Sequence, residues 1–408
     1  MKSLISLSLI LLGLLAASCR RNINSPDLSG NIGTRQTSVP WPGLANSPWP
    51  MYSHDPQHTS RSSFRGPQQG VVVWLFNAGN SVYSSPAIGE GGSIYFGDMS
   101  FYAHSISSSG TPVWAFLGGG SDASPLIGSD GSIYFYGNGN PLSHGLFSYD
   151  ESGHLNWQFT FNKFEGLSSP SISIDGGTIY CLADSVFALQ RNGQLRWKTA
   201  LPDSDLAHYA LAVSPDGSTL FVPGYKGIYA LDTSGAARWK YSLPVTPSDP
   251  AIDNQGNVYF AMGSDLYSLS ASGGTRWIHA GLDLTGGDTG PAIGGDGTIY
   301  ITGAALYAID NNGALKWAYN LPPMTYSQCI PAIDLNGTVF FGRNTARTVA
   351  DSINFLAINP DGTLKFQMCL RSPDGTVPDI DSHPSISSDG SIYVGSDRPH
   401  GYHVYRIE

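Results

Sequence analysis

The sequence predicts an all-β protein: an eight-bladed β-propeller of four-stranded antiparallel blades, closed by an N-terminal strand that completes the last blade. Repeated sequence patterns and the phase of the repeat both support this fold. The 408 residues include 49 glycines and 27 prolines, 12% of them are aromatic, and only 13% are charged. This composition is typical of many short strands joined by tight turns.

The first repeated pattern is a glycine followed four residues later by tryptophan. It occurs seven times, and an eighth copy has Phe366 in place of tryptophan. Successive aromatic positions lie 38 to 43 residues apart, with a final interval of 49, which is about the length of one four-stranded blade. We expect these tryptophans to be structural residues of the blades: Trp74, Trp114, Trp157, Trp197, Trp239, Trp277 and Trp317.

Two further patterns place the strands within each repeat. One is glycine, a small polar residue, Ile or Val, and then Tyr or Phe, as in Gly297-Thr298-Ile299-Tyr300; the other is proline, a small residue and a branched residue, as in Pro86-Ala87-Ile88. In the first complete repeat they predict strands near residues 86–88, 93–97, 101–106 and 112–116. Asp-Gly pairs such as Asp130-Gly131 predict hairpin turns, because glycine accepts a positive φ. Calcium loops are the alternative interpretation of these pairs, although no EF-hand spacing surrounds them.

The phase of the repeat predicts how the ring closes. The repetitive region begins with a single outer strand at residues 71–76 and ends after a third strand at residues 403–407. Each end supplies what the other lacks, so the eighth blade is expected to combine both ends of the region. Pairing them removes an open sheet edge that would invite aggregation. We therefore expect a monomeric ring.

The N-terminus predicts export and membrane anchoring. Lys2 precedes an apolar run at residues 4–15, followed by small residues and Cys19, an order that resembles a bacterial lipobox. This resemblance implies a lipoprotein signal peptide at 1–18, lipidation of Cys19 and, because Arg20 follows, the outer membrane in a diderm cell. An ordinary secretory signal is the alternative. Residues 19–47 are predicted as a flexible tether and 48–408 as the propeller.

Two segments resemble a known family. The run Trp49-Pro50-Met51-Tyr52-Ser53-His54-Asp55-Pro56 is similar to the segment that leads into pyrroloquinoline quinone-like propellers, and the stretch from Tyr229 to Trp239 resembles their tryptophan-docking motif. The likeness covers roughly residues 48–408. It implies a blade tryptophan packed on the glycine turn of an adjacent blade. Within that family, the chain looks most like the non-enzymatic lipoprotein branch, which includes the propeller lipoprotein of the outer-membrane β-barrel assembly machinery.

Several functional classes find little support in the sequence. The formal net charge of -10, without clustered Lys and Arg beyond Arg20 and Arg21, argues against a nucleic-acid partner. The quinone-dependent dehydrogenases of the family carry an adjacent cysteine pair that this chain lacks, so neither pyrroloquinoline quinone nor calcium is supported as a cofactor. No metal-ligand spacing and no nucleophile motif appear. We expect a protein without catalytic residues or a bound metal.

A candidate ligand-binding ring is predicted from the loops that join the blades. These loops should emerge on one face beside the central channel, and carboxylates there could bind a cation, a basic peptide or a sugar. The ring consists of the polar residues three positions before the proline slot, namely Tyr83, Asp122, His208, Asp288, Gln328 and Asp381. Four more polar residues lie close by in the sequence: Asp203, Asp205, Asp379 and His383. The alternative is a solvated rim that binds only water.

The two longest insertions, residues 343–354 and 371–383, predict a partner-binding surface, because loops on a rigid scaffold commonly carry recognition. Neutral variation in loop length is the alternative. Taken together, the sequence favours an anchored scaffold that binds an envelope protein. A surface protein that binds carbohydrate or another small ligand is the second hypothesis, and a quinone- or metal-dependent oxidoreductase is the third.

Overall fold

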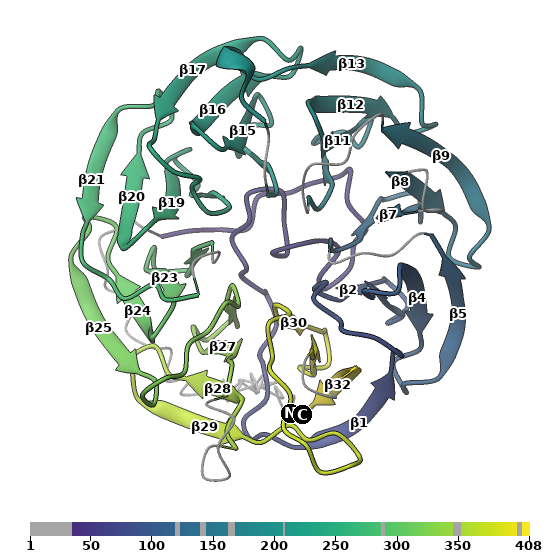
Figure 1. The fold of residues 1–408 in the computed structure, drawn as a ribbon, viewed down its shortest axis with the longest axis vertical. Coiled ribbons are helices and arrows are strands. Elements are labelled where there is room, and N and C mark those ends of the chain that lie inside the picture. The colour runs from purple at the N-terminus through teal and green to yellow at the C-terminus, as the bar shows by residue number, and fades with distance from the viewer. Residues whose placement is uncertain are drawn as a thin grey trace, which may run out of the picture.

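The computed structural model describes residues 35–118, 123–138, 144–161, 168–206, 209–286, 290–345, 352–397 and 402–408. Within these residues, eight four-stranded antiparallel sheets surround a central axis as the blades of a propeller (Figure 1). The predicted fold class and the predicted number of blades are therefore confirmed. We number the blades 1 to 8 in the order in which their innermost strands occur in the chain.

Seven blades are continuous in sequence, each running from its innermost to its outermost strand. Blades 1 to 4 contain β2 (Ala87–Ile88), β3 (Ile94–Gly97), β4 (Tyr102–Ile106) and β5 (Pro112–Leu117); β6 (Leu126–Ile127), β7 (Ile133–Asn138), β8 (His144–Tyr149) and β9 (Leu155–Phe161); β10 (Ser171–Ile172), β11 (Thr178–Leu182), β12 (Val186–Gln190) and β13 (Leu195–Thr199); and β14 (Ala212–Val213), β15 (Thr219–Gly224), β16 (Gly227–Asp232) and β17 (Ala237–Ser242). Blades 5 to 7 contain β18 (Ala251–Ile252), β19 (Val258–Met262), β20 (Asp265–Leu269) and β21 (Thr275–His279); β22 (Ala292–Ile293), β23 (Ile299–Thr302), β24 (Ala305–Ile309) and β25 (Leu315–Asn320); and β26 (Ala332–Ile333), β27 (Val339–Gly342), β28 (Phe355–Ile358) and β29 (Leu364–Met368). A short 3-10 helix, η2 (Pro202–Ser204), lies between blades 3 and 4.

Blade 8 joins the two ends of the repetitive region. Its inner strands are β30 (Ser385–Ile386), β31 (Ile392–Gly395) and β32 (His403–Ile407), and its outermost strand is β1 (Val72–Asn77). β1 and β32 are antiparallel, and Val71 and Glu408 exchange two backbone hydrogen bonds of 2.8 and 2.9 Å. The predicted closure by the N-terminal strand is confirmed.

The tryptophans join each blade to the next. The seven blade tryptophans all donate the indole N–H to a backbone carbonyl in the outer turn of the following blade, at 2.8 to 3.0 Å. The indole ring of each tryptophan lies against the glycine of that turn. At Gly313, for example, φ is +89° and an added Cβ would lie 2.7 Å from the ring of Trp277. The glycine and the tryptophan of the repeated pattern thus act in two different blade interfaces.

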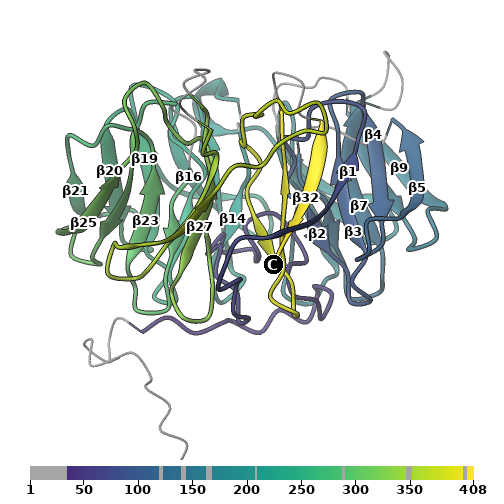
Figure 2. The same cartoon turned by 90° about the horizontal axis from the view of Figure 1, so that it is seen from below.

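The sheets define two faces of the ring. The turns between the first and second strands, and between the third and fourth, lie on one face, which we call the turn face. The loops between the second and third strands, and those between blades, lie on the opposite face, which we call the loop face. Residues 36–66, which we call the plug segment, run along the turn face and across the axis (Figures 1 and 2).

Backbone hydrogen bonds tie the plug segment to the innermost strands. Six blades donate the N–H of the branched residue in the proline pattern to a plug carbonyl, at 2.7 to 2.9 Å. The donors are Ile88, Ile127, Val213, Ile252, Ile293 and Ile333, and the acceptors are Trp49, Pro50, Pro56, Gln57, Thr59 and Ser60. Blade 3 contributes differently, because Gly43 donates its N–H to the carbonyl of Ile174. The predicted tether covers residues 19–47. Its last part, residues 36–47, belongs to the plug segment, and Trp41 and Leu44 are buried there.

We predict that the close packing of tryptophan on glycine makes the glycines of the outer turns intolerant of a side chain beyond the cost of their positive φ. Gly313→Ala should lower the free energy of unfolding by about 2 to 4 kcal/mol, because the methyl group meets the Trp277 ring in addition to the cost of a positive φ. Gly79→Ala is the matched control, since Gly79 has φ +88° but no atom within 4 Å of an added Cβ. It should cost only about 1 to 2 kcal/mol. Urea denaturation measures both; equal losses would show that the interface tolerates the methyl group.

Candidate functional site

Three residues of the predicted ligand-binding ring can be placed. Asp122, His208 and Asp288 lie outside the described residues, whereas Tyr83, Gln328 and Asp381 lie in loops of the loop face. Tyr83 is half-buried. Gln328 donates its side-chain N–H to the carbonyl of Gly286 at 2.7 Å, which joins it to the loop of the preceding blade. Asp381 belongs instead to an acidic group in blade 8.

A different ring of residues surrounds the axis, and its hydrogen bonds link blades 8, 1, 2 and 3. These residues stand one position before the proline slot, two residues later than the predicted ring. The backbone N–H of His383 donates to Ser85 Oγ at 3.2 Å, that of Ser85 to Ser124 Oγ at 2.8 Å, and that of Ser124 to Ser169 Oγ at 2.9 Å. Sequence reasoning missed this ring, although the repeated Ser-Pro pairs at Ser85, Ser124 and Ser169 were a signal for it.

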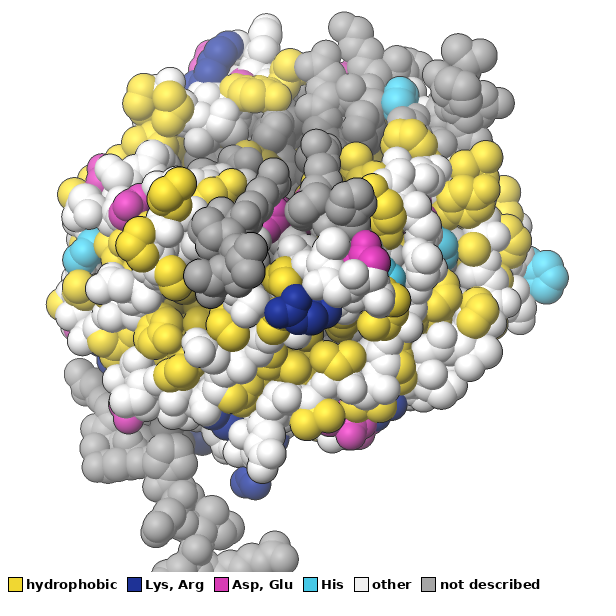
Figure 3. All heavy atoms as spheres, turned by 60° about the horizontal axis from the view of Figure 1, so that its bottom comes forward, with side chains coloured by type: hydrophobic (Ala, Val, Ile, Leu, Met, Phe, Trp, Pro, Cys, Tyr) yellow, Lys and Arg dark blue, Asp and Glu magenta, His cyan; other side chains and the backbone are white. Residues whose placement is uncertain are grey.

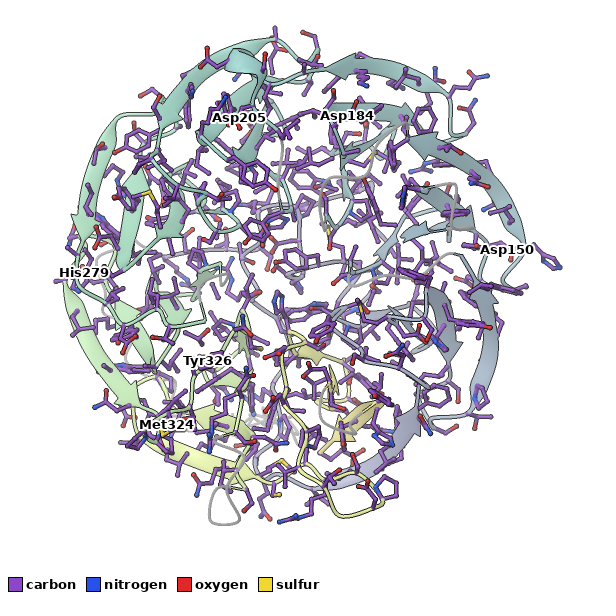
Figure 4. The ribbon with its side chains drawn as sticks, in the orientation of Figure 1. Asp150, Asp184, Asp205, His279, Met324 and Tyr326 are labelled. Atoms are coloured by element: carbon purple, nitrogen blue, oxygen red, sulfur yellow. The ribbon has the colours of Figure 1, made fainter. Side chains whose placement is uncertain are left out.

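Four polar side chains meet near the axis. Tyr52 and His58 come from the plug segment, and Asp249 and His383 come from the ring before the proline slot. The Tyr52 hydroxyl donates to Asp249 Oδ2 at 2.7 Å, and its ring centroid lies 5.2 Å from the rings of both His58 and His383. Asp249 also accepts the N–H of Ala210 at 2.5 Å. Figure 4 shows side chains that point from the blades toward the axis of the ring.

Burial determines the protonation of the axial group. Burial lowers the pKa of His58 to about 4, although the Asp55 carboxylate acts in the opposite direction. Burial, aided by the neighbouring His58, lowers the pKa of His383 to about 3. Burial and the carboxylate of Asp249 together raise the pKa of Tyr52 well above its usual value. At neutral pH the two histidines and the tyrosine of this group are therefore neutral.

Asp55 organises the plug segment where it approaches the axis. Its Oδ1 accepts the N–H groups of Gln57 and Thr59, each at 3.1 Å, and its Oδ2 accepts from the Thr59 hydroxyl and contacts His54. Burial alone would raise the pKa of Asp55, but the bonds from His54 and Thr59 outweigh it and lower that pKa. These bonds support a contorted backbone, since Ser53, His54, His58 and Ser60 all have positive φ.

An acidic group lies beside the axis in blade 8 and the loop that leads to it. Asp379 and Asp397 are buried, and the N–H of Asp397 donates to the carbonyl of Asp379 at 3.1 Å. Burial, together with the charges of Asp397 and Asp379, holds the pKa of Asp381 well above its usual range. Asp381 Oδ1 and His383 Nδ1 are shielded from solvent and have no hydrogen-bond partner among the described residues. This group can retain a proton on Asp381 where an isolated carboxyl would have lost it.

The other polar residues near the predicted ring stabilise loops. Asp205, labelled in Figure 4, accepts a hydrogen bond from the Tyr229 hydroxyl at 2.8 Å and from the N–H of Lys226 at 2.7 Å. Asp203 is exposed and forms an ion pair with Lys240 at 2.7 Å. The Asp-Gly turns are stabilised within themselves, as where Asp296 Oδ1 accepts the N–H of Thr298 at 2.9 Å. In the described parts of the chain, no three His, Cys, Asp or Glu side chains are arranged to hold a metal ion.

The two long insertions form one surface on the loop face. Asn354 Nδ2 donates to the carbonyls of Leu370 and Pro378 at 3.0 and 2.9 Å. Thr345 donates its N–H to Asp379 Oδ1 at 2.9 Å, so the two insertions contact each other at both ends of the first one. Residues 346–351 lie outside the described residues. We call the described parts of the two insertions, residues 343–345, 352–354 and 371–383, the double insertion.

The tip of the double insertion is a hydrogen-bonded turn. The N–H of Ser372 donates to the carbonyl of Thr376 at 3.0 Å, and that of Gly375 donates back to Ser372 at 2.9 Å. Asp374 Oδ1 accepts both the N–H and the hydroxyl of Thr376, and Arg371 donates to the carbonyl of Gly375 at 2.9 Å. Arg371 and Asp374 are exposed. A charged pair is therefore presented on a turn that is already ordered.

Neutral buried histidines predict an acid-sensitive ring. The unfolded chain takes up protons at His58 and His383 near pH 6.5, whereas the folded chain does so only near pH 4 and 3. Their contribution to stability is therefore complete above about pH 6.5 and is lost as the pH falls. We predict a loss of about 3 to 5 kcal/mol between pH 6.5 and 4.5, measured by urea denaturation.

Replacement of one axial histidine should reduce this pH dependence. His58→Gln should flatten the stability profile between pH 6.5 and 4.5 relative to the parent protein, whatever its effect on absolute stability. His154→Gln is the control, because His154 lies on the surface with 82% of its side chain exposed and should leave the slope unchanged. If His58→Gln leaves the slope as it was, His58 is not a source of the acid sensitivity.

Comparisons with known proteins support the fold. No protein-family model and no curated protein sequence matches the chain. Among solved structures, BamB from Moraxella catarrhalis is similar with a TM-score of 0.60 at 15% identity, over 83% of this chain and 97% of that one. A streptogramin B lyase structure aligns with a TM-score of 0.48 at 15% identity, over 82% and 97% of the two chains. In the described parts of the chain, no helix is both long and apolar enough to span a membrane. The chain is thus an eight-bladed β-propeller that resembles BamB in fold.

Proposed function

We propose that this protein is an exported, membrane-anchored propeller that acts as a protein-binding scaffold in the cell envelope, without catalysis. The anchor is the predicted lipid on Cys19, and the outer membrane is its proposed location. The fold likeness to BamB is compatible with this proposal but does not carry it, because a propeller fold serves many functions.

The observation that carries the proposal is the double insertion. The two longest insertions of the repeat meet on the loop face and hydrogen-bond to each other. The exposed tip around Arg371 and Asp374 is ordered before any partner arrives, so binding would cost little conformational entropy. The ring beneath it is rigid, since the plug segment and the tryptophan joints connect its blades. A preordered charged projection on a rigid body is suited to recognition of a protein.

The predicted contact can be tested by co-purification. The full chain, extracted from membranes in mild detergent, should retain an envelope protein that is lost from Arg371→Ala/Asp374→Ala. This double variant removes the exposed charges and the turn bonds but leaves Asn354 and the base of the insertion intact. We expect at least a tenfold loss of the retained partner, measured by quantitative mass spectrometry.

The control for this experiment is Asp203→Ala. Asp203 is also exposed and charged on the same face, but it lies in the loop between blades 3 and 4. It should leave the retained partner unchanged. Equal retention by the parent chain and the Arg371/Asp374 variant would refute the double insertion as the contact surface.

A further inference from the structure

The outermost strands of the eight blades are not equally protected at their edges. The residue before the blade tryptophan, or before Phe366, is Arg or Lys in blades 3 to 7 and Asn156 in blade 2. The cationic residues are Arg196, Arg238, Arg276, Lys316 and Lys365. The same position is Val73 in β1 and Val113 in β5, which belong to the neighbouring blades 8 and 1. Charges on an edge strand prevent pairing with other chains, and β1, β5 and β9 have none; among these three, β1 and β5 carry an apolar residue at this position.

Exposed apolar side chains lie on both of these outer strands. β1 lies against blade 1, because Trp74 donates its indole N–H to Ser108 and the ring of Phe76 lies 6.1 Å from that of His104. Hydrophobic side chains are spread over the outer wall that faces the viewer in Figure 3. The exposed ones on blade 1 include Tyr102 of β4 and its cross-strand neighbour Leu117 of β5, together with Val113 of β5. Val113 and Leu117 are 57% and 65% exposed.

The backbone of β5 is available at its outer edge. Within the described residues, β5 pairs with β4 alone. The N–H of Gly118 donates to the carbonyl of Phe101 at 2.7 Å, which marks one hydrogen-bonded pair. Hydrogen-bonded pairs alternate along an antiparallel ladder. The backbone N–H and C=O groups of Trp114 and Phe116 therefore point toward β4, whereas those of Ala115 and Leu117 point away from the sheet. These groups can receive a further strand.

Charge limits the kind of partner that fits. β5 has no charged or polar side chain, so it offers no counter-ion to a charged strand and imposes no repulsion on a neutral one. A second copy of the chain would bring another body with net charge -10, and this repulsion opposes self-association. A lipid bilayer would leave the edge N–H and C=O groups of Ala115 and Leu117 without partners.

From these observations we propose that the free edge of β5 binds an extended, uncharged strand of another protein by β-augmentation. The partner segment would be about five or six residues long, matching β5, with apolar residues at alternate positions that contact Val113 and Leu117. This surface lies on the outer wall of blade 1 and is separate from the double insertion of blade 7. The inference therefore does not depend on the proposed contact at Arg371 and Asp374.

A synthetic peptide tests the proposal directly. The probe is a fluorescent nine-residue peptide in which Val and Thr alternate, and binding to the full chain is followed by fluorescence anisotropy. A second peptide with the same side chains carries N-methyl groups on alternate residues, which removes the backbone donors needed for strand pairing. We expect the first peptide to bind and the N-methylated peptide to bind at least tenfold more weakly.

Protein variants locate the site on β5. Val113→Lys installs the kind of residue that five other blades carry at this position, so the fold should be retained, as circular dichroism would verify. It should weaken peptide binding at least tenfold, and Leu117→Lys should do the same. Val245→Lys is the control, since Val245 is 53% exposed in the loop between blades 4 and 5. The control should bind as the parent chain does.

Three results would overturn the proposal. The first is equal binding of the peptide to the parent chain and to both β5 variants. The second is equal binding of the methylated and unmethylated peptides, which would indicate apolar adhesion without strand pairing. The third is dimerisation of the parent chain in analytical ultracentrifugation that Val113→Lys abolishes, because the edge would then be occupied by a second copy.

Discussion

The pairing of β1 with β32 is the constraint on which the rest of this molecule depends. A propeller blade contacts only its two neighbours, so an open chain of blades would leave one apolar sheet face exposed at each end. Here the ladder that joins Val72–Asn77 to His403–Ile407 completes the eighth blade and closes the ring, so each blade packs between two others. The tryptophan joints then continue around the seam, because Trp74 on the borrowed strand docks on Gly110 of blade 1.

Closure also explains how the plug segment becomes part of the ring. The chain crosses the axis before it enters β1, so the innermost strands of blades 1 to 7 can all contact residues 36–66. Its carbonyls accept one N–H from each of six blades, which gives the innermost strands of those blades a further backbone partner. The short innermost strands need such a partner, since each has only two residues in its ladder with the second strand. The turn-face end of the channel is consequently filled by Tyr52, His58 and their neighbours.

The fold could be predicted because its determinants are local and repeated. Glycine at the outer turn recurs in each repeat, tryptophan four residues later and proline at the innermost strand recur in all but one repeat each, and the missing strands at the two ends are complementary. The site could not be predicted in the same way. The residues that link the blades stand one position before the proline slot. A serine hydroxyl reaches the next blade from there only at a certain distance between blades, and a local sequence pattern does not give that distance. The contacts of Tyr52 with Asp249 and His383 join residues 197 and 331 positions apart, beyond any local pattern.

The distribution of side chains on the outer strands follows from the same closure. Blades 3 to 7 carry a cation before the aromatic residue, and in blades 5 and 7 that cation lies over an aromatic ring, as Arg276 does over Tyr259 at 5.8 Å. In blades 3 and 4 the lysine after the tryptophan, Lys198 or Lys240, has this position. At the seam, β1 and β5 carry valine at that position, while Arg406 of β32 provides the nearby charge and donates to Ser108 across the blade interface. The closing blade thus differs from the others both in its connectivity and in its surface.

Calorimetric unfolding of a chain in which residues 70–76 are replaced by a Gly-Ser segment of equal length tests the closure most directly, because the plug segment keeps its connection while the borrowed strand is lost. The account predicts a melting temperature lower by more than about 10 °C and a transition that is no longer a single cooperative one, since blades 7 and 1 lose their shared neighbour. A single transition at the parent melting temperature would contradict it.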